Sequence, residues 1–406
     1  MNKTGIFLEG DRSLYPQPGP DGKLDLDLSS HKYIKLWHGP NHPGITGNMS
    51  VELTVCADEV MEAKTHVGYL HRGFEKLMER RKYIQNFPLV CRIAVPEPDF
   101  NEFNYASCIE ELSGIQVPEK AQWLRTLVLE MARLQGFLMW IGGMAGAVGF
   151  GTVGQWSNYL RDLMLDRFEE LTGARIYHIY ILPGGVRNDL PDGFKERMEA
   201  NLKEIEGFMK DIRRVLFDNY VFKKRAVGTG IIDPSWIYPF GIVGPNARAA
   251  GFKLDVRKNY PYGKYKELDF DIITAIDSDI YTRAFLRYQE LLNDVDLIRQ
   301  ILAKMPEKGE FMGKTPNMMY LKIPAGETYV RSECTRGEYG YYLVSDGSEY
   351  PRRVNVRGPS YTHAVALLEK MLVNANIADV AQIMVSLHTY PRSEERRVGK
   401  ECRSRW

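Results

Sequence analysis

The chain has 406 residues, of which 44% are hydrophobic and 26% charged, and its formal net charge is +1. It is long enough to bury a large core, and its nearly balanced charge gives no reason to expect a nucleic-acid partner. Its five cysteines are far apart and form no Cys-x-x-Cys pair, which argues against a disulfide framework and favours a reducing compartment.

The N-terminal region, residues 1–70, is predicted to be rich in strands and loops. It begins without the long apolar segment of a secretory signal, so we expect a cytoplasmic location. In Ser50–Val55, apolar and polar side chains alternate as in a half-buried strand. Before it, His38–Gly47 contains two prolines and three glycines and is predicted to be a rigid loop.

The central region, residues 71–310, is predicted to be a bundle of helices. A short helix is expected over Gly73–Phe87. Three longer segments then repeat apolar residues every three or four positions, which is the spacing of an amphipathic helix. They are Glu119–Ile141, Asp192–Leu216 and Asp279–Met305. Long amphipathic helices of this kind pack together as a bundle.

An uncharged stretch, Leu134–Trp156, has the length of a membrane span. It contains seven glycines, each of which weakens a helix by about 1 kcal/mol relative to alanine, and it lacks the dense Leu, Ile and Val content of a lipid-facing helix. We therefore expect a buried helix that ends in a glycine-rich turn, and contact with a membrane only through partner proteins.

The C-terminal region, residues 311–391, is predicted to be a small α+β unit that ends in a helix over Tyr361–Leu372. Its expected strands are Glu327–Val330, Tyr341–Val344 and Arg353–Val356. The fold class is therefore α+β: an N-terminal β-rich region, a central bundle of long helices and a small C-terminal α+β region.

The last fifteen residues, 392–406, do not fit the rest of the chain. They contain six basic and three acidic residues and follow an apolar segment abruptly. Their sequence resembles the translation of a sequencing-library adapter fused in frame to a truncated gene. We therefore expect the natural sequence to be lost soon after Pro391, and we give this tail no functional weight.

An ordered series of motifs runs through the chain from about His38 to Leu387. Its blocks include Gly68–Lys76, Arg92-Ile93, Leu171–Arg175, Arg248–Gly251, Asp255–Lys258 and Arg336–Gly347. The series resembles the large-subunit family that is shared by respiratory complex I, where it is the D subunit, and the nickel–iron hydrogenases. The resemblance implies a position at the end of an electron-transfer chain, against a small subunit that carries the terminal iron–sulfur cluster.

The resemblance to the hydrogenase branch is incomplete, because the metal ligands are missing. In that branch a Cys-x-x-Cys pair follows the position of Arg92-Ile93, where this chain has Ala94–Glu97. The second pair is missing as well, since Ser386-Leu387 is followed by His388. A nickel–iron centre needs soft thiolate ligands, so we expect no such centre and no metal bound by this chain. The 4Fe-4S cluster, which also needs thiolates, is expected in the partner subunit.

The resemblance places His178 and Arg92 beside that cluster. An imidazole titrates near neutral pH and could couple an electron to a proton, and a fixed guanidinium raises a reduction potential. The alternative for a single histidine or arginine is a solvated or core-paired side chain. Glu338, in contrast, is expected to form only a structural ion pair with an arginine.

The acceptor site departs from that of the quinone-reducing members. Those members hydrogen-bond the quinone through a histidine and a tyrosine, at the positions of Thr46 and Val95 here. His42 and Asp99 remain as groups that could exchange protons. With neither the thiolates nor the quinone pair, the chain resembles the large subunit of the membrane-bound sulfane sulfur reductase of anaerobic archaea, and the implied acceptor is polysulfide.

The segment Pro88–Asp99 is predicted to line the acceptor pocket. Cys91 lies where hydrogenases have a glutamate that passes protons to the metal. A thiol there could contact sulfur chains, and a small buried hydrophobe is an equally good interpretation. Glu97 and Asp99, together with Glu102, could form a proton path, and the alternative is surface charge in a loop.

We thus predict the large subunit of a complex-I-like oxidoreductase, peripheral to the cytoplasmic face of the membrane. The implied donor is reduced ferredoxin. The implied partners are a small iron–sulfur subunit similar to the B subunit of complex I, a second protein similar to its C subunit, and ion-translocating membrane subunits. Two alternatives stay open: the D subunit of an NADH–quinone or ferredoxin–quinone oxidoreductase, and a structural coupling subunit without direct chemistry.

Overall fold

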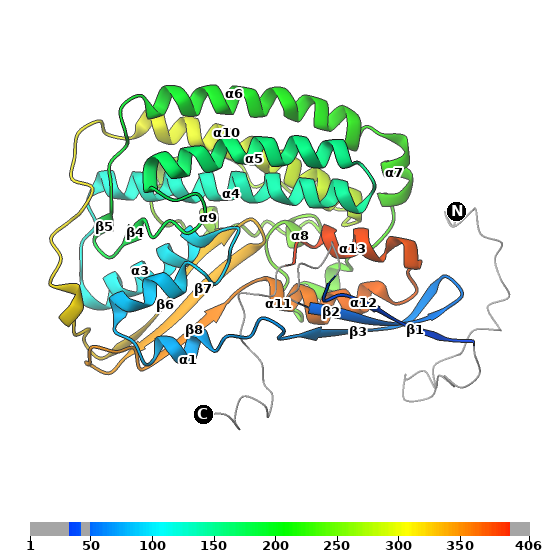
Figure 1. Ribbon diagram of the computed structural model, residues 1–406, viewed down its shortest axis with the longest axis horizontal. Coiled ribbons are helices and arrows are strands. Elements are labelled where there is room, and N and C mark those ends of the chain that lie inside the picture. Colours follow the sequence, from blue (N-terminus) through cyan, green and yellow to red (C-terminus); the bar gives the residue numbers. More distant parts are fainter. Residues whose placement is uncertain (1–31, 42–48, 390–406) are drawn as a thin grey trace.

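The structure, a computed structural model, describes residues 32–41 and 49–389. A layer of long helices lies at the top of Figure 1, and two antiparallel three-stranded sheets lie below it. The predicted α+β class is confirmed. The buried hydrophobic side chains form one core cluster, which reaches from Met49 in the N-terminal sheet to Leu387 near the C-terminus.

Four long helices make up the bundle (Figure 1). They are α4 (Glu119–Ala147), α5 (Gly151–Thr172), α6 (Phe194–Ile212) and α10 (Ile280–Lys304). Helix α4 packs against α5 and α10, and α6 packs against the same two helices. The three long helices predicted from the apolar spacing are confirmed, as α4, α6 and α10, whereas α5 was not predicted.

The uncharged stretch Leu134–Trp156 ends α4, turns, and begins α5. The turn uses Gly149 in the left-handed region, with φ +89°, where glycine is favoured. The two helices approach closely, because a Cβ added to Gly142 of α4 would lie 3.6 Å from the carbonyl oxygen of Gly154 in α5. The predicted buried helix with a glycine-rich turn is confirmed. Within the described ranges, no helix is long and apolar enough to cross a membrane.

The N-terminal sheet has the order β1-β2-β3, with all neighbours antiparallel. Its strands are β1 (Ile34–His38), β2 (Met49–Cys56) and β3 (Glu59–Val67). The predicted strand Ser50–Val55 is confirmed as part of β2, and its apolar side chains are buried. Most of the predicted loop His38–Gly47 lies outside the described residues.

The single helix predicted over Gly73–Phe87 is wrong. The chain instead forms α1 (Phe74–Met78), a 3-10 turn η3 (Tyr83–Asn86) and α2 (Phe87–Val90). The side chain of Asn86 donates from Nδ2 to the carbonyl oxygen of Met78 at 3.1 Å. A side chain therefore satisfies the carbonyl at the end of α1 that a continued helix would otherwise have satisfied.

The C-terminal region contains a second antiparallel sheet and a group of short helices. The strands are β6 (Gly326–Cys334), β7 (Gly337–Ser345) and β8 (Arg353–Arg357). The helices are α11 (Ser360–Thr362), a π turn (His363–Leu367), α12 (Leu368–Leu372) and α13 (Val380–Ser386). The predicted strands and the helix predicted over Tyr361–Leu372 are confirmed, although β6 and β7 are longer than expected.

Helix α3 (Pro98–Ser113) was not predicted. It contacts α4 on one side and β6 and β7 on the other. Because most of its side chains are buried, including the polar Asp99, Asn101 and Glu102, its sequence shows no separate apolar face. A start signal was present nonetheless, since Pro98 occupies the first helical position and Asp99 lies in the first turn.

Short elements complete the fold. They are the ladder β4 (Ile181–Leu182) and β5 (Gly185–Val186), the helices α7 (Tyr220–Ala226), α8 (Pro245–Arg248) and α9 (Val256–Asn259), a π turn (Arg213–Phe217), and 3-10 turns at Pro234–Trp236, Tyr265–Glu267, Met318–Tyr320 and Ile377–Asp379. The ladder lies against α3, and its strand β5 also contacts α4. Each of these short elements has only two to seven residues.

Replacement of Gly185 by alanine is expected to destabilise the fold by about 1–3 kcal/mol. A Cβ at this position would lie 2.2 Å from the carbonyl oxygen of Phe311 and 2.8 Å from Cα of Met312, and backbone atoms cannot move aside singly. Gly207, an exposed position of α6 with no atom within 4 Å of an added Cβ, is the matched control. Alanine there should stabilise the protein by about 0.5–1 kcal/mol. Equal thermal midpoints of the two variants would contradict this prediction.

Candidate functional site

The candidate site lies on the segment between α2 and α3. Helix α2 ends at Val90, Cys91 and Arg92 follow, and α3 begins after its N-cap residue Glu97. Asp99 and Glu102 are therefore one helical turn apart on α3. The prediction of a loop is wrong for these two carboxylates. The alternative of surface charge is wrong for both, and for Glu97, since all three are buried.

A buried pair joins Asp99 to His178. Oδ1 of Asp99 lies 2.8 Å from Nδ1 of His178, and neither side chain is exposed. The imidazole also stacks on Phe168 of α5, with ring centroids 4.1 Å apart. Burial alone would lower the pKa of His178, but Asp99, with a smaller contribution from Glu102, raises this pKa above its usual value. His178 is therefore held in one orientation and biased towards imidazolium.

The second ring nitrogen of His178 has a different environment. Nε2 is buried and makes no hydrogen bond of normal geometry with the described residues, although an interaction with the backbone of Arg175 helps to raise the pKa of His178. Leaving a buried polar atom unsatisfied costs about 1–3 kcal/mol. This atom therefore indicates where a group from another molecule, or from the undescribed part of the chain, can bind.

Arg92 is the exposed member of the site. Its guanidinium carbon lies 4.7 Å from the ring centroid of Tyr177, the residue before His178. Its Nη1 donates to the carbonyl oxygen of Pro88 at 2.8 Å and to Sγ of Cys91 at 3.1 Å. These neutral acceptors and the aromatic ring fix the cation at the surface without cancelling its charge.

The thiol of Cys91 is buried next to Arg92. It donates weakly to the carbonyl oxygen of Pro88 at 3.5 Å. Burial, with a smaller contribution from Glu102, raises the pKa of Cys91 to about 12. The thiol is therefore protonated at neutral pH and is not a thiolate nucleophile. Its packing supports the interpretation as a small buried hydrophobe, and contact with sulfur chains stays a prediction.

Glu102 connects α3 to the segment that carries His178. Its carboxylate accepts hydrogen bonds from the backbone N–H groups of residues 179–181 at 2.7, 2.8 and 3.1 Å. Burial and the charge of Asp99 raise the pKa of Glu102 to about 8, against the opposing effects of His178 and the backbone donors. The two carboxylates and the imidazole thus form one buried group in which protonation of any member depends on the others.

Glu97 contacts the turn between β6 and β7. Its Oε1 accepts from the N–H of Thr335 at 2.7 Å, and its Oε2 accepts from Nη2 of Arg336 at 2.5 Å. The side chains of Glu97 and Arg336 are each 1% exposed. Because both carboxylate oxygens are engaged, the geometry supports a structural role for Glu97, and a role in proton transfer stays a prediction.

Two further predicted residues can be placed near the C-terminal region. His388 is buried, with its ring 6.0 Å from that of Trp140. Burial and nearby guanidiniums hold the pKa of His388 well below its usual value, so the ring is neutral. The predicted structural ion pair of Glu338 is confirmed, at 3.6 Å from Arg331 and 3.8 Å from Arg357.

Other parts of the predicted site are not brought together by the structure. His42 and Thr46 lie outside the described residues, and Val95 is half-buried. In the described ranges, no three His, Cys, Asp or Glu side chains are grouped so that they could hold a metal ion. The four described cysteines are unbridged. Thiolates for an iron–sulfur cluster are thus not assembled by this part of the chain.

Two features were missed from the sequence, one in the site and one outside it. Phe168 and Tyr177, which position His178 and Arg92, carry no local signal of that role. A cluster of buried arginines and carboxylates at the base of the bundle was also missed. Arg133, which lies amid the apolar residues of α4, was the available signal, since an arginine is almost never fully buried unless it is paired.

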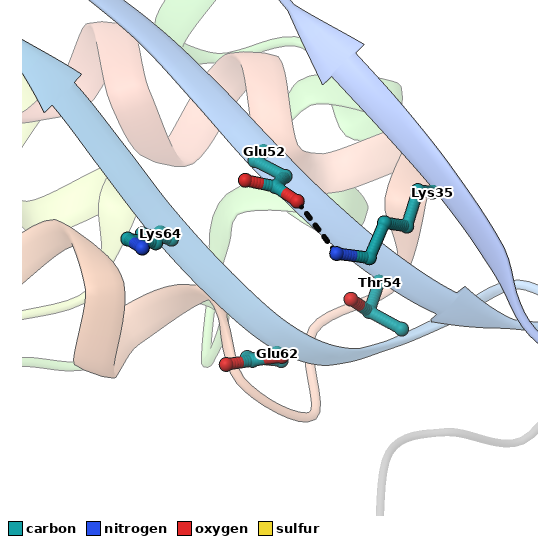
Figure 2. A pocket seen from close by; sticks show the side chains of 5 residues that line it. All are labelled: Lys35, Glu52, Thr54, Glu62 and Lys64. Carbon is teal, nitrogen blue, oxygen red and sulfur yellow. Dashed lines mark hydrogen bonds and ion pairs between the residues drawn. The ribbon is translucent and has the colours of Figure 1, made fainter. Parts of the chain in front are cut away.

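A shallow hollow of about 110 Å³ on the N-terminal sheet does not resemble a ligand site. Figure 2 shows its lining: Lys35 of β1, Glu52 and Thr54 of β2, and Glu62 and Lys64 of β3. Lys35 pairs with Glu52 at 2.8 Å. Side chains of both signs that pair with each other are typical of a solvated sheet face, so we assign no function to this hollow.

The comparisons with known proteins agree on one family. The model of the family described as "Respiratory-chain NADH dehydrogenase, 49 Kd subunit" matches residues 147–394. The D subunit of NADH-quinone oxidoreductase from Thermosipho melanesiensis is 43% identical over 353 residues, which cover 86% of this chain and 95% of that protein. The D subunit of F420H2 dehydrogenase from Methanosarcina mazei is 35% identical, covering 86% of this chain and 94% of that protein.

A solved structure is similar over almost its whole length. It is a chain from the membrane-bound sulfane sulfur reductase, described as an archaeal respiratory membrane complex. The match has a TM-score of 0.88 and 42% sequence identity, and it covers 90% of this chain and 99% of that chain. The identities to the protein from Thermosipho and to the reductase chain are nearly equal, so identity alone does not separate the acceptors that the two names imply.

Proposed function

Since the chain belongs to the family of the 49-kDa or D subunit of respiratory-chain NADH dehydrogenase, we propose that it is the large subunit of a membrane-bound oxidoreductase that reduces sulfane sulfur. Electrons come from reduced ferredoxin and pass through the iron–sulfur cluster of a small partner subunit. The chain binds peripherally to membrane subunits that translocate ions, on the cytoplasmic face. It forms the wall of the cavity in which the acceptor is reduced.

The observation that carries the choice of acceptor is the residue at position 95. The segment between α2 and α3 has the half-buried, apolar Val95 where quinone-reducing members have a tyrosine hydroxyl. A buried site that hydrogen-bonds a substrate oxygen needs a donor at that point. A sulfur chain needs none, and the likeness to the sulfane sulfur reductase over 99% of the matched chain supports the same acceptor.

Two residues of this chain, His178 and Arg92, are suited to lie next to an iron–sulfur cluster that a partner subunit binds. Nε2 of His178 is buried and makes no hydrogen bond of normal geometry with the described residues, and Arg92 holds an uncancelled cation at the surface beside Tyr177. A cluster bound by the partner would supply electrons one at a time. His178 would donate a hydrogen bond towards the partner subunit, and the positive charge of Arg92 would favour the reduced state of the partner's cluster.

The proposed reaction breaks one S–S bond of a polysulfide dianion. It consumes two electrons and one proton and yields hydrosulfide and a dianion that is one sulfur shorter. Glu102 and His178 can hold that proton close to the acceptor, because both are buried beside Asp99 and the pKa of each is raised. Arg92 attracts the anionic substrate to the mouth of the cavity.

Quinone reduction is the second candidate, because the protein from Thermosipho that is 43% identical is named as part of an NADH-quinone oxidoreductase. Turnover of the purified membrane complex with reduced ferredoxin separates the two candidates. We expect sulfide from polysulfide and no quinol from a soluble quinone. Quinol formation without sulfide would contradict the proposal and would make Val95 a tolerated substitution in a rebuilt quinone site.

A pair of variants sharpens this test. Val95→Phe and Val95→Tyr fill the same half-buried space and differ only by a hydroxyl. A sulfane sulfur site should lose activity similarly in both variants, because both narrow the cavity. A quinone site should produce more quinol with tyrosine than with phenylalanine, because the hydroxyl restores a hydrogen-bond donor.

A further inference from the structure

A cluster of buried charged side chains lies between α4, α10, α8, α9 and the end of β6. It consists of three guanidiniums and five carboxylates, whose side chains are 0–3% exposed. Its members are Arg133, Arg248, Arg257, Glu130, Asp255, Glu290, Asp294 and Glu333. We call this set the ionic cluster. None of its members belongs to the candidate site described above.

The ionic cluster has more carboxylates than guanidiniums. Arg287, one turn before Glu290 on α10, interacts electrostatically with Glu290 and adds a fourth cation. Arg283, a further turn earlier, interacts instead with Asp279. Five carboxylates therefore face four guanidiniums. An unbalanced charge in a dry interior is strongly disfavoured, and a carboxylate in that position binds a proton instead.

Asp294 is the carboxyl group best placed to hold this proton. It follows Glu290 by one turn of α10, so two like charges lie on the same helix face. Its two guanidinium partners are shared: Arg133, at 3.2 Å, also contacts Glu290, and Arg257, at 3.0 Å, also contacts Asp255. Burial raises the pKa of Asp294 well above its usual value, with smaller contributions from the charges of Glu130 and Glu290 and against the opposing charges of Arg133 and Arg257.

The charged and titratable groups of the ionic cluster and beside it come from several elements. They are Glu130 and Arg133 of α4, Arg248 of α8, Asp255 and Arg257 at α9, Glu290 of α10, Glu333 of β6 and the hydroxyl groups of Tyr262 and Tyr265. The hydroxyl of Tyr265 donates to Oε1 of Glu130 at 2.5 Å. Burial, which Arg248 opposes, raises the pKa of Glu333 to about 7, so Glu333 is a second carboxyl of the ionic cluster that binds a proton more readily than usual.

The ionic cluster is connected to the candidate site through the end of β6. Arg133 donates to the carbonyl oxygens of residues 333 and 334 at 3.1 and 3.2 Å, and Arg248 contacts the carboxylate of Glu333 at 2.7 Å. The next two residues, 335 and 336, are those that bind Glu97. The same short turn is therefore anchored by the ionic cluster and holds the segment that begins α3.

We propose that Asp294 binds a proton at neutral pH. Loss of this proton in alkaline solution weakens the hydrogen bonds at the end of β6 and those from residues 335 and 336 to Glu97. This inference does not depend on which acceptor the complex reduces. The direction follows from linkage: a carboxyl whose pKa is higher in the folded than in the unfolded state contributes its full stability at low pH. That contribution is lost as the pH rises through the folded-state pKa.

Two isosteric variants test where the proton lies. Asparagine has the shape and neutrality of a protonated aspartate. Asp294→Asn is therefore expected to change the thermal midpoint of the purified complex at pH 7 by less than about 2 °C. Asp255→Asn is expected to lower it by about 5 °C or more, because it removes the carboxylate that pairs with Arg257 at 2.9 Å and leaves the ionic cluster with one uncompensated positive charge. An equal loss in both variants would overturn the proposal.

A second measurement tests the consequence and needs only the wild type and Asp294→Asn. Hydrogen–deuterium exchange of the peptide that contains residues 333–337 is followed at increasing pH and corrected for intrinsic exchange rates. The wild type should lose protection in alkaline solution, whereas the variant should keep it, because its four remaining carboxylates balance four guanidiniums once Glu333 is ionised. Identical pH profiles would overturn the proposed link, whatever product the complex forms from polysulfide or quinone.

Discussion

Exchange of Glu97 for glutamine is expected to destabilise the protein by about 3–5 kcal/mol, because it leaves the guanidinium of Arg336 buried without its carboxylate. The two side chains are 1% exposed and lie 2.5 Å apart, and the other oxygen of Glu97 accepts from the N–H of Thr335. Since Glu97 is also the N-cap residue of α3, the loss should reach Asp99 and Glu102 and lower the turnover of the complex.

Glu338→Gln is the matched control for this prediction. Glu338 lies on the neighbouring strand β7, its side chain is 21% exposed, and its arginine contacts are long, at 3.6 and 3.8 Å. Its loss should cost less than about 1 kcal/mol. Chemical unfolding of the purified complex measures both. Equal effects of the two variants would show that the Glu97–Arg336 pair contributes no more than an exposed pair.

A double variant separates the buried charge from the lost contact. Glu97→Gln combined with Arg336→Met removes both charges and replaces the guanidinium by an apolar side chain of similar length. Because replacing a whole buried pair is often nearly neutral, the double variant should be more stable than Glu97→Gln alone. A further loss in the double variant would mean that Arg336 stabilises the β6–β7 turn through its other contacts.

The long helices could be predicted from the sequence because their burial is one-sided. Helices α6 and α10 repeat apolar residues at helical spacing. The caps of α10 coincide with the predicted ends, and α6 starts within two residues of its predicted start but passes into the π turn Arg213–Phe217 before its predicted end. Helix α3 could not be found in this way. Its polar side chains Asn101 and Asn104 are as buried as its apolar ones, and each forms a hydrogen bond with the distant strand β7.

The members of the candidate site could be named from motifs, but their pairing could not. His178 and Asp99 are 79 residues apart, and Glu97 and Arg336 are 239 apart, so no local pattern joins them. The buried Nε2 of His178 and the cation–π contact of Arg92 depend on packing that only the folded chain creates. Burial of the carboxylates at positions 97, 99 and 102 likewise reversed the surface interpretation.

The midpoint potential of the partner's terminal cluster is expected to depend on pH, by about 59 mV per unit when one proton accompanies one electron. The dependence should lie above about pH 6.5, the ordinary histidine pKa, because Asp99 raises the pKa of His178. Asp99→Asn removes this carboxylate, so the pH-dependent range should move to lower pH. His178→Gln should abolish it. Redox titration of the purified complex at several pH values measures these shifts.

Arg92 supplies the matched comparison, because its cation does not titrate in this range. Arg92→Ala should lower the potential by about 40 mV or more at every pH, the equivalent of about 1 kcal/mol for one electron, and leave the slope unchanged. Arg92→Lys keeps a charge at the surface beside Tyr177 and should restore most of the loss. If none of these variants moves the potential, His178 and Arg92 only shape the interface, and the chain is a structural coupling subunit whose chemistry belongs to its partners.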